Sequence, residues 1–146
     1  MAHVFSEAEN KAWLAGLPKK SVAVKLIIRS ADDKILLVKP NYKNTWQFPG
    51  GGVEQQEEPK EALVRELLEE LGLELAQDAL RIVGTVFRKE HDNLILIYEL
   101  RKPLADRLTV EIAQDEIEQY EFVAANEVAP RLSDYYSAFW SNYLSE

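Results

Sequence analysis

The sequence contains no cysteine, and only one methionine and two histidines occur among its 146 residues. The absence of cysteine excludes disulfides, thiolate zinc sites and a cysteine nucleophile. No apolar run reaches the roughly 18 residues that a membrane-spanning helix needs, and the N-terminus has no apolar region of a signal peptide. We therefore expect a cytoplasmic protein without a membrane partner.

Positive charge is also scarce, since 17 Lys and Arg residues face 25 Asp and Glu residues, for a net charge of −8. Nucleic acids and anionic membranes are bound by basic surfaces, so neither partner is expected. An acidic protein repels a phosphorylated ligand unless metal ions bridge its carboxylates to the phosphates. The apolar fraction of 47% is ordinary for a globular chain, and we expect a single domain over residues 1–146.

Apolar patterning predicts an α/β fold with layers of helices around a mixed sheet. Ser6 and Glu9 have the spacing of a capping box, which predicts a helix over about 6–16 that packs against the domain or a second subunit. A last helix over about 133–144, capped by Ser133, has aromatic residues on one side. That aromatic side is typical of a core, with a pocket wall or a dimer surface as alternatives. Strands are expected at 21–29, 35–38, 80–88, 94–100, 108–112 and the end of 115–123.

The first two of these strands are expected to pair as a hairpin. In the first one, Val24 and Leu26 should face one side, and Lys25 and Ile27 the other. The strands 80–88 and 94–100 are joined by a polar turn that contains His91, which we interpret as a solvated turn residue.

The segment 51–73 carries an unusual helix. Glu66, Glu69 and Glu70 are three and four residues apart, so a helix places them on one side, beside a leucine stripe. Because Gly72 should end the helix, these anions lie in its last turns, where the helix dipole favours cations and each anion costs about 0.3–1 kcal/mol. Such an arrangement indicates function, and the hard cation Mg²⁺ is the natural counter-ion of clustered carboxylates.

The approach to this helix is rich in glycine. The three consecutive glycines Gly50, Gly51 and Gly52 allow the backbone to come close to a neighbour, so a carbonyl could reach a metal ion held by the helix. The whole stretch resembles the signature of the Nudix hydrolases, G-x5-E-x7-R-E-U-x-E-E-x-G-U, in which U is a bulky aliphatic residue. Its specified positions are filled by Gly51, Glu57, Arg65, Glu66, Leu67, Glu69, Glu70, Gly72 and Leu73. Many members have glycine before the first glutamate, where this chain has Gln56.

The resemblance implies a Nudix α/β/α sandwich around a mixed, mostly antiparallel sheet. It also implies cleavage of a nucleoside diphosphate linked to another group, with Mg²⁺, or Mn²⁺ in its place, as cofactor. By matched position the metal ligands are Glu66, Glu69 and Glu70, with Gly50 or Gly51 adding a carbonyl. Glu66 and Glu69 are the catalytic candidates; Glu66 is the general base in some members, whereas other members take the base from a later loop.

Further candidates surround this set. Glu57 and Arg65 have opposite charges and are expected to pair and fix the loop against the helix. In Nudix enzymes a glutamate of a later loop often completes the metal site, which points to Glu116 or Glu118, or to an ordinary solvated acidic loop.

Substrate contacts are expected from four further residues, two of which have an alternative interpretation. Lys25 is either a phosphate contact or a lysine that extends along an edge to solvent, and Trp46 is either a base-stacking platform or core packing. The four candidates are Lys25, Tyr42, Trp46 and Arg88.

The substrate itself does not follow from these residues. The short chain resembles the branch of the family that acts on nucleoside triphosphates, including oxidised purine forms. The alternatives are a nucleotide-sensing module that has lost catalysis, which the complete set of glutamates disfavours, and an acidic interaction domain that uses the aromatic C-terminal helix. A homodimer is compatible with each of these.

Overall fold

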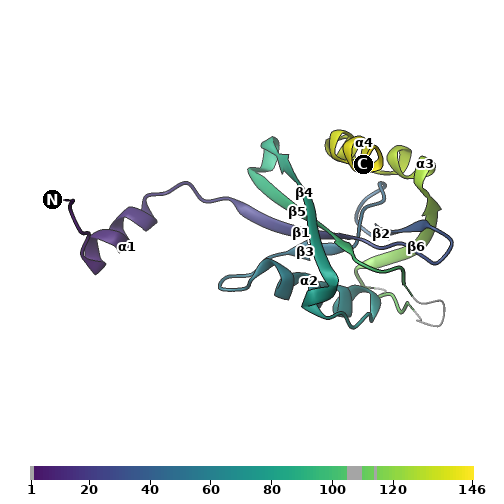
Figure 1. The fold of residues 1–146 in the computed structure, drawn as a ribbon, viewed down its shortest axis with the longest axis horizontal. Coiled ribbons are helices and arrows are strands. Elements are labelled where there is room, and N and C mark those ends of the chain that lie inside the picture. The colour runs from purple at the N-terminus through teal and green to yellow at the C-terminus, as the bar shows by residue number, and fades with distance from the viewer. Residues whose placement is uncertain (1, 105–109, 114) are drawn as a thin grey trace.

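The computed structural model describes residues 2–104, 110–113 and 115–146 (Figure 1). Its helices and strands, connected in places by short 3₁₀ turns, are α1 (Glu7–Ala15), β1 (Ser21–Ile27), β2 (Lys34–Pro40), β3 (Gly50–Gly52), α2 (Pro59–Leu71), β4 (Leu80–Arg88), β5 (Asn93–Leu100), β6 (Ile117–Ala124), α3 (Ala125–Val128) and α4 (Ser137–Leu144). Among the residues described, no helix is long and apolar enough to cross a membrane.

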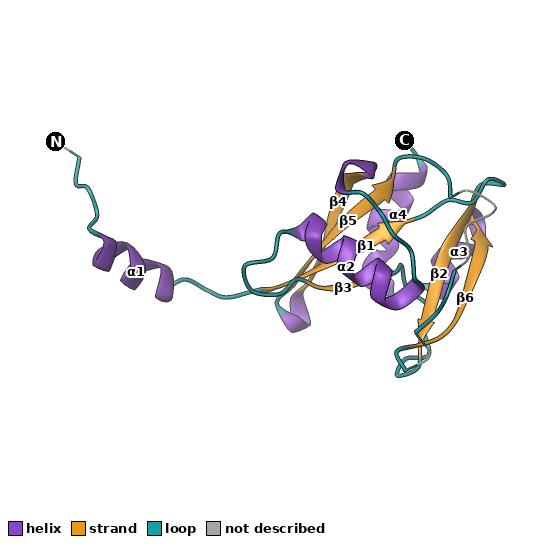
Figure 2. Cartoon of the chain, turned by 90° about the horizontal axis from the view of Figure 1, so that it is seen from below, coloured by secondary structure: helices purple, strands orange, loops and turns teal. Residues whose placement is uncertain are grey.

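The strands divide into two sheets. The larger has the order β3-β1-β5-β4, in which β1 and β5 are parallel and the other pairs antiparallel. The strands β2 and β6 pair antiparallel as a separate ribbon, and Figure 2 shows this ribbon set apart from the larger sheet. The expected α/β fold with a mixed, mostly antiparallel arrangement is therefore confirmed.

The hairpin predicted for β1 and β2 is correct only at its turn. The amide of Leu36 donates to the carbonyl of Ile28 at 3.0 Å, and Arg29 bridges Ile35, but beyond this point the two strands separate. The reason is that β3 and β5 already occupy both edges of β1, so β2 has no edge of β1 to pair with and takes β6 instead.

Both faces of the sheets are buried, so the fold has three layers: α2 on one side, the sheets in the middle and α4 on the other side. Val24 and Leu26 of β1 pack in one core with Leu63 and Leu67 of α2. On the other face, Ile27 belongs to a second core that contains the aromatic residues of α4. The alternation predicted for the first strand is thus confirmed, and each face has its own helical cover (Figures 1 and 2).

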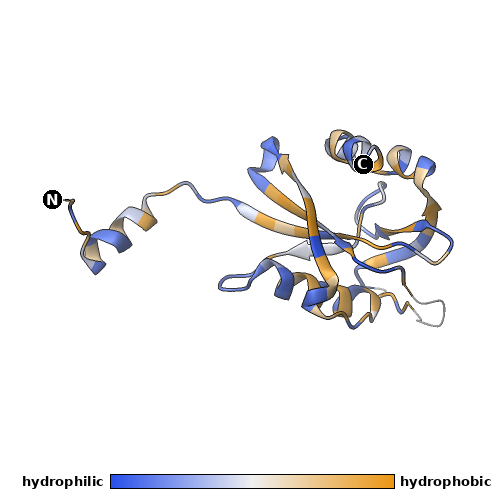
Figure 3. Cartoon of the chain, in the orientation of Figure 1, coloured by the Kyte–Doolittle hydropathy of each residue, from blue (hydrophilic) through white to orange (hydrophobic). Residues whose placement is uncertain are grey.

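The N-terminal helix has the predicted cap but not the predicted packing. The Ser6 hydroxyl accepts from the Glu9 amide, and the Glu9 carboxylate accepts from the Ser6 amide, both at 3.1 Å. Yet no residue of α1 is buried, the Trp13 side chain is 58% exposed, and the helix stands away from the body of the molecule (Figure 1). Figure 3 shows apolar and polar residues mixed along α1. The prediction that this helix packs against its own domain is therefore wrong. That it packs against a second subunit stays a prediction.

The C-terminal helix covers the second core. Tyr136 and Trp140 are buried, and each ring centroid lies 5.6 Å from that of Phe48. The expected cap is wrong, because α4 begins at Ser137 after a 3₁₀ turn and the Ser133 hydroxyl bonds Thr45 at 3.4 Å instead of a backbone amide.

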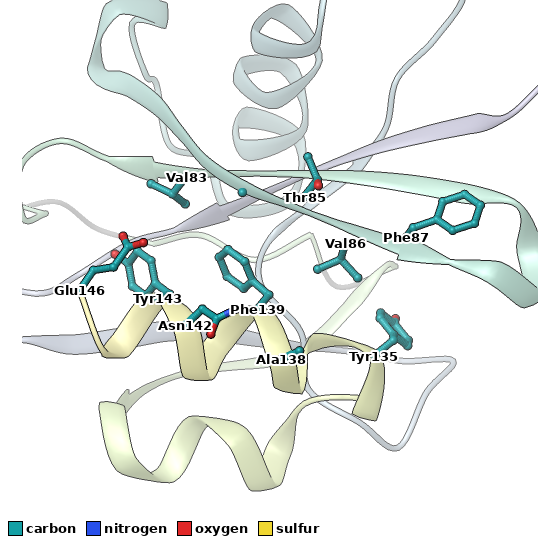
Figure 4. Close-up of a pocket in the computed structure, with 11 residues that line it drawn as sticks. Val83, Thr85, Val86, Phe87, Tyr135, Ala138, Phe139, Asn142, Tyr143 and Glu146 are labelled. Atoms are coloured by element: carbon teal, nitrogen blue, oxygen red, sulfur yellow. The ribbon is translucent and has the colours of Figure 1, made fainter.

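A cavity beside α4 is not lined by the acidic residues of the box. It has a volume of about 470 Å³ and lies between α4 and β4 (Figure 4). Phe139 and Tyr143 of α4 line it, and Gly84 of β4 is so close to Phe139 that a Cβ there would lie 2.7 Å from the ring. Apart from Glu146, its lining is uncharged, so it offers no group for phosphate chemistry.

Two smaller expectations concern the loops. Of the strand predicted at 108–112, residues 108 and 109 lie outside the described residues, and 110–112 form no strand. His91 lies exposed in a 3₁₀ turn between β4 and β5, as expected.

Candidate active site

The helix α2 places its acidic residues through a simple register. Pro59 occupies its first turn, and Gly72 ends it in a left-handed conformation with φ of 66°. Between them, the stripe that contains Leu63, Leu67 and Leu71 is buried against the sheet. Because successive residues are about 100° apart, this burial directs the glutamates toward the edge of the sheet where β3 lies.

The three glutamates of this helix line one cavity of about 340 Å³. Their exposure differs, because Glu70 is buried with 5% of its surface accessible, while the Glu69 side chain is 53% exposed and Glu66 lies between. The cavity is lined by Tyr42, Gln47, Gly50, Gly51, Glu66, Glu69, Glu70, Glu116 and Ile117. All six residues expected at the metal site are therefore neighbours in space.

The glycines of β3 press closely on this cavity. The Gly50 amide donates to the Glu70 carboxylate at 3.4 Å. A Cβ on Gly51 would lie 2.4 Å from the carboxyl carbon of Glu66, whereas a Cβ on Gly52 would meet no atom within 4 Å. Only the absence of a side chain at Gly51 leaves room for the Glu66 carboxylate.

This contact gives a direct prediction for two adjacent glycines. Gly51→Ala should displace the Glu66 carboxylate and lower turnover by roughly 10²-fold, the scale of losing one well-placed charged group, with little change in melting temperature. Gly52→Ala is the matched control and should retain activity. Steady-state kinetics and thermal melts of both variants test this, and equal activity in the two would contradict it.

Arg65 joins the loop to the helix. Its guanidinium donates two hydrogen bonds to Glu57, at 2.8 and 2.9 Å, and one to the Gly52 carbonyl at 3.0 Å. It also reaches Glu66 at 3.0 Å and Glu69 at 3.3 Å. The Arg65 hydrogen bonds lower the pKa of Glu57 to about 2, so this carboxylate is charged over the physiological range. The pairing expected for Glu57 and Arg65 is present.

Gln56, the departure from the common family pattern, has a left-handed backbone with φ of 61°. A side chain in this conformation costs about 1–2 kcal/mol, of which the larger unfolded-state freedom of glycine offsets about 0.5–1 kcal/mol. Gln56→Gly should therefore stabilise the chain by about 0.5–1 kcal/mol and raise the melting temperature by about 1–4 °C. Gln55→Gly, one residue earlier, has no such strain to relieve. Thermal melts in which both variants lose stability equally would refute the explanation.

A second, smaller cavity of about 160 Å³ adjoins the acidic one and shares Tyr42, Gln47, Gly50 and Gly51 with it. Three of the four substrate candidates line it, namely Lys25, Tyr42 and Arg88. Burial lowers the pKa of Lys25 to about 8, against the attraction of Glu70. Burial also raises the pKa of Glu70 to about 7. The positive charge of Lys25 opposes this increase, and the negative charge of Glu66 adds to it.

Some candidates lie elsewhere. Trp46 lines neither cavity, packs against the second core and has the Arg131 guanidinium 5.3 Å from its ring centre. Glu118 pairs with Lys39 at 2.5 Å, which leaves Glu116 as the loop glutamate at the cavity. Tyr136, from the aromatic side for which a pocket wall was an alternative, lines the smaller cavity. Sequence reasoning missed Lys43, Gln47, Asn93 and Tyr135, which also line the cleft. Only Gln47, inside the glycine-rich approach, had a signal that could have found it.

The oxygen ligands fit a hard divalent cation. Within the described part of the chain, no three acidic or histidine side chains are grouped tightly enough to hold a metal ion by themselves. Mg²⁺ does not require such a cage, because it is commonly held by one or two carboxylates together with substrate phosphates and water. Glu66 and Glu70, with Gly50 and Gly51 beside them at one cavity, match that requirement.

Comparison with known proteins decides the family. The family model of the NUDIX domain matches residues 19–139, which is most of the chain. The chain belongs to the NUDIX family. Among solved structures, this Nudix chain is similar to a MutT protein from Methanosarcina mazei Go1, with a TM-score of 0.73 and 23% identity over 89% of this chain and 97% of that one. A MutT Nudix hydrolase from Burkholderia pseudomallei gives a TM-score of 0.70 and 20% identity over 85% and 98%. At 20–23% identity, this structural similarity shows only that the chains share a fold.

Curated relatives match over a shorter stretch. RNA pyrophosphohydrolase from Hydrogenovibrio crunogenus is 43% identical over 61 residues, which are 42% of the Nudix chain and 36% of that protein. The enzyme of the same name from Halorhodospira halophila is 48% identical over 50 residues, 34% and 28% of the two chains. The matched stretch thus spans only about a third of each relative.

Proposed function

We propose that this Nudix chain is a Mg²⁺-dependent pyrophosphohydrolase that cleaves a phosphoanhydride bond of a nucleotide. The observation that carries the proposal is the acidic cavity, where α2, β3 and the loop before β6 bring Glu66, Glu69, Glu70 and Glu116 together. In an acidic protein such a group can receive a polyphosphate only with a cation between them.

The residues have distinct roles in this proposal. Glu66, Glu69 and Glu70 hold Mg²⁺, with the Gly50 or Gly51 carbonyl and Glu116 as further oxygen ligands. The ion, when bound, neutralises charge on the phosphoryl oxygens and makes a water molecule more acidic.

The carboxylate of Glu66 accepts the proton of the attacking water, and Glu69 supports the same step from the exposed rim. Arg65 positions both carboxylates through the hydrogen bonds at 3.0 and 3.3 Å.

Two substrate classes have support. A free (d)NTP or an oxidised purine nucleotide is favoured by the small volumes of the two adjoining cavities, about 340 and 160 Å³. The 5′ end of an RNA is favoured by the name of the matched relatives, RNA pyrophosphohydrolase. The net charge of −8 disfavours extended contact with RNA beyond its terminal phosphates. The alternative function that is not enzymatic is a nucleotide-sensing module without catalysis.

A hydrolysis panel tests the proposal. The chain is incubated with dNTPs, oxidised dNTPs, ADP-ribose, dinucleoside polyphosphates and 5′-triphosphorylated RNA, and phosphate and pyrophosphate release is measured. We expect turnover with Mg²⁺ or Mn²⁺ and none with EDTA. Metal-dependent binding without turnover of any compound would instead establish the sensing module. Turnover that persists in EDTA would refute the metal role.

A further inference from the structure

The smaller cavity of the cleft is surrounded by three cations from distant parts of the chain. Lys25 lies on β1, Lys43 on the loop after β2, and Arg88 at the end of β4. No acidic residue is among the described residues that line this cavity. In a chain with a net charge of −8, three converging cations without a lining anion require an explanation.

These cations have few partners. Across the described ranges, none of the three forms an ion pair or a side-chain hydrogen bond. The Arg88 guanidinium stacks 4.3 Å from the ring centre of Tyr135, and its Nε is buried without a hydrogen-bond partner. The Lys43 amine lies 5.7 Å from the ring centre of Tyr42.

Burial of such donors is costly unless an anion accepts from them. An unsatisfied buried polar group costs roughly 1–3 kcal/mol, and a charged one costs more. Lys25 is only 8% exposed. Glu70 lines only the other cavity, where its carboxylate accepts from the Gly50 amide. The cavity is therefore preorganised for an anion that is not part of the chain.

The two cavities form one cleft with opposite charge at its ends. Gly50 and Gly51 line both, so a ligand can extend from the glutamates across the glycine strand to the cations. A diphosphate bridge held by Mg²⁺ at the acidic end would leave a further group of the substrate at the cationic end.

We propose that the cavity of Lys25, Lys43 and Arg88 is an anion subsite that binds a phosphate group of the substrate beyond the diphosphate bridge that is cleaved. The inference rests on the proposed function for the position of that bridge. It assigns the substrate to compounds with three or more consecutive phosphates, in preference to a nucleoside diphosphate joined to a neutral sugar. Arginine binds phosphate through paired N–H donors, and lysine binds it as a point charge.

Binding of inorganic tripolyphosphate in metal-free buffer with EDTA tests the subsite without any need for catalysis. Isothermal titration calorimetry should show one site per chain. Lys43→Ala and Arg88→Ala should each weaken binding about tenfold, and Arg88→Lys should retain part of it. Lys89→Ala is the matched control, because this exposed lysine follows Arg88 and lines neither cavity, and its binding should equal that of the wild type. No binding by the wild type, or an equal loss in Lys89→Ala, would overturn the subsite.

Kinetics then place the subsite in the reaction. The ratio of kcat/KM for a nucleoside triphosphate to that for a nucleoside diphosphate sugar should fall about tenfold in Arg88→Ala, while thermal melts confirm that the variant is folded. An unchanged ratio, with altered preference among bases instead, would make the cavity a base site and overturn the proposal. If no nucleotide is hydrolysed at all, the proposed function fails, and the tripolyphosphate titration still decides the subsite.

Discussion

Glu70→Gln should lower turnover by at least about 10³-fold, or about 4 kcal/mol in activation free energy, while the chain remains folded. Glu70 is the most buried of the cavity carboxylates, and glutamine keeps its size but offers a neutral ligand in place of a charged one. Phosphate release at saturating substrate and Mg²⁺ measures the effect. Activity within tenfold of the wild type would remove Glu70 from the metal site.

The same variant should be at least as stable as the wild type in metal-free buffer. The glutamate lies in the last turn of α2, where the dipole disfavours an anion, and burial raises its pKa to about 7, so the fold disfavours the charged form. Glutamine removes both costs, and its side-chain oxygen can still accept from the Gly50 amide. A melting temperature clearly below that of the wild type would show that the attraction between Glu70 and Lys25 outweighs these costs.

Glu61→Gln is the control for this substitution. Glu61 is on the same helix but exposed in its first turn, and it does not line the cavity. Its replacement should leave turnover unchanged and cost only the small dipole contribution, about 0.3–1 kcal/mol. A similar loss of turnover in both variants would indicate a general effect of helix charge.

Arg65→Ala should damage both stability and rate. The side chain donates to Glu57, Glu66, Glu69 and the Gly52 carbonyl, so its loss leaves the loop without its attachment to α2. Charge-assisted hydrogen bonds contribute about 1.5–3 kcal/mol, and partial exposure places the total loss at about 2–3 kcal/mol, or roughly 4–12 °C in melting temperature. Urea and thermal melts, with kinetics at a temperature where both proteins are folded, measure the two effects.

The stability effect should depend on pH with a defined sign. Arg65 lowers the pKa of Glu57 from about 4.5 to about 2, so their pairing stabilises the fold above the unfolded pKa and is lost as pH falls toward 2. The difference in stability between the wild type and Arg65→Ala should therefore be largest at neutral pH and shrink below pH 4.5. A difference that grows on acidification would contradict the pairing.

Two further variants define the role of Arg65. Arg65→Lys should recover little stability, because lysine cannot span Glu57 and Gly52 at once. Arg81→Ala removes an exposed arginine that pairs with Glu99, and should change stability by less than about 1 kcal/mol and leave turnover intact.

Apart from Glu116, which the family resemblance indicated, the glutamate side of the cleft could be predicted because its residues are close in sequence. Glu66, Glu69 and Glu70 share one helix, and the glycine-rich approach is next to it in the chain, so helical spacing and backbone freedom were enough to bring them together. The capping box of α1 and the alternation of β1 are equally local and were also predicted.

What lay beyond prediction depends on long-range contacts. The separation of β1 from β2 follows from which strands occupy the edges of β1, and no pattern within 21–38 encodes that choice. The exposed position of α1 is likewise visible only in the folded chain, where none of its residues is buried.

By itself, the sequence determined the helix that carries the carboxylates and the glycine-rich approach beside it, because helical periodicity and glycine freedom act over a few residues, and the resemblance of this stretch to a known signature indicated the family. Only the tertiary structure decided that Lys25, Lys43 and Arg88, from three separate segments, surround one cavity without a lining carboxylate. The physical reason is that charges separated along the chain interact only after the strands have paired, and the cost of their burial exists only in the folded state.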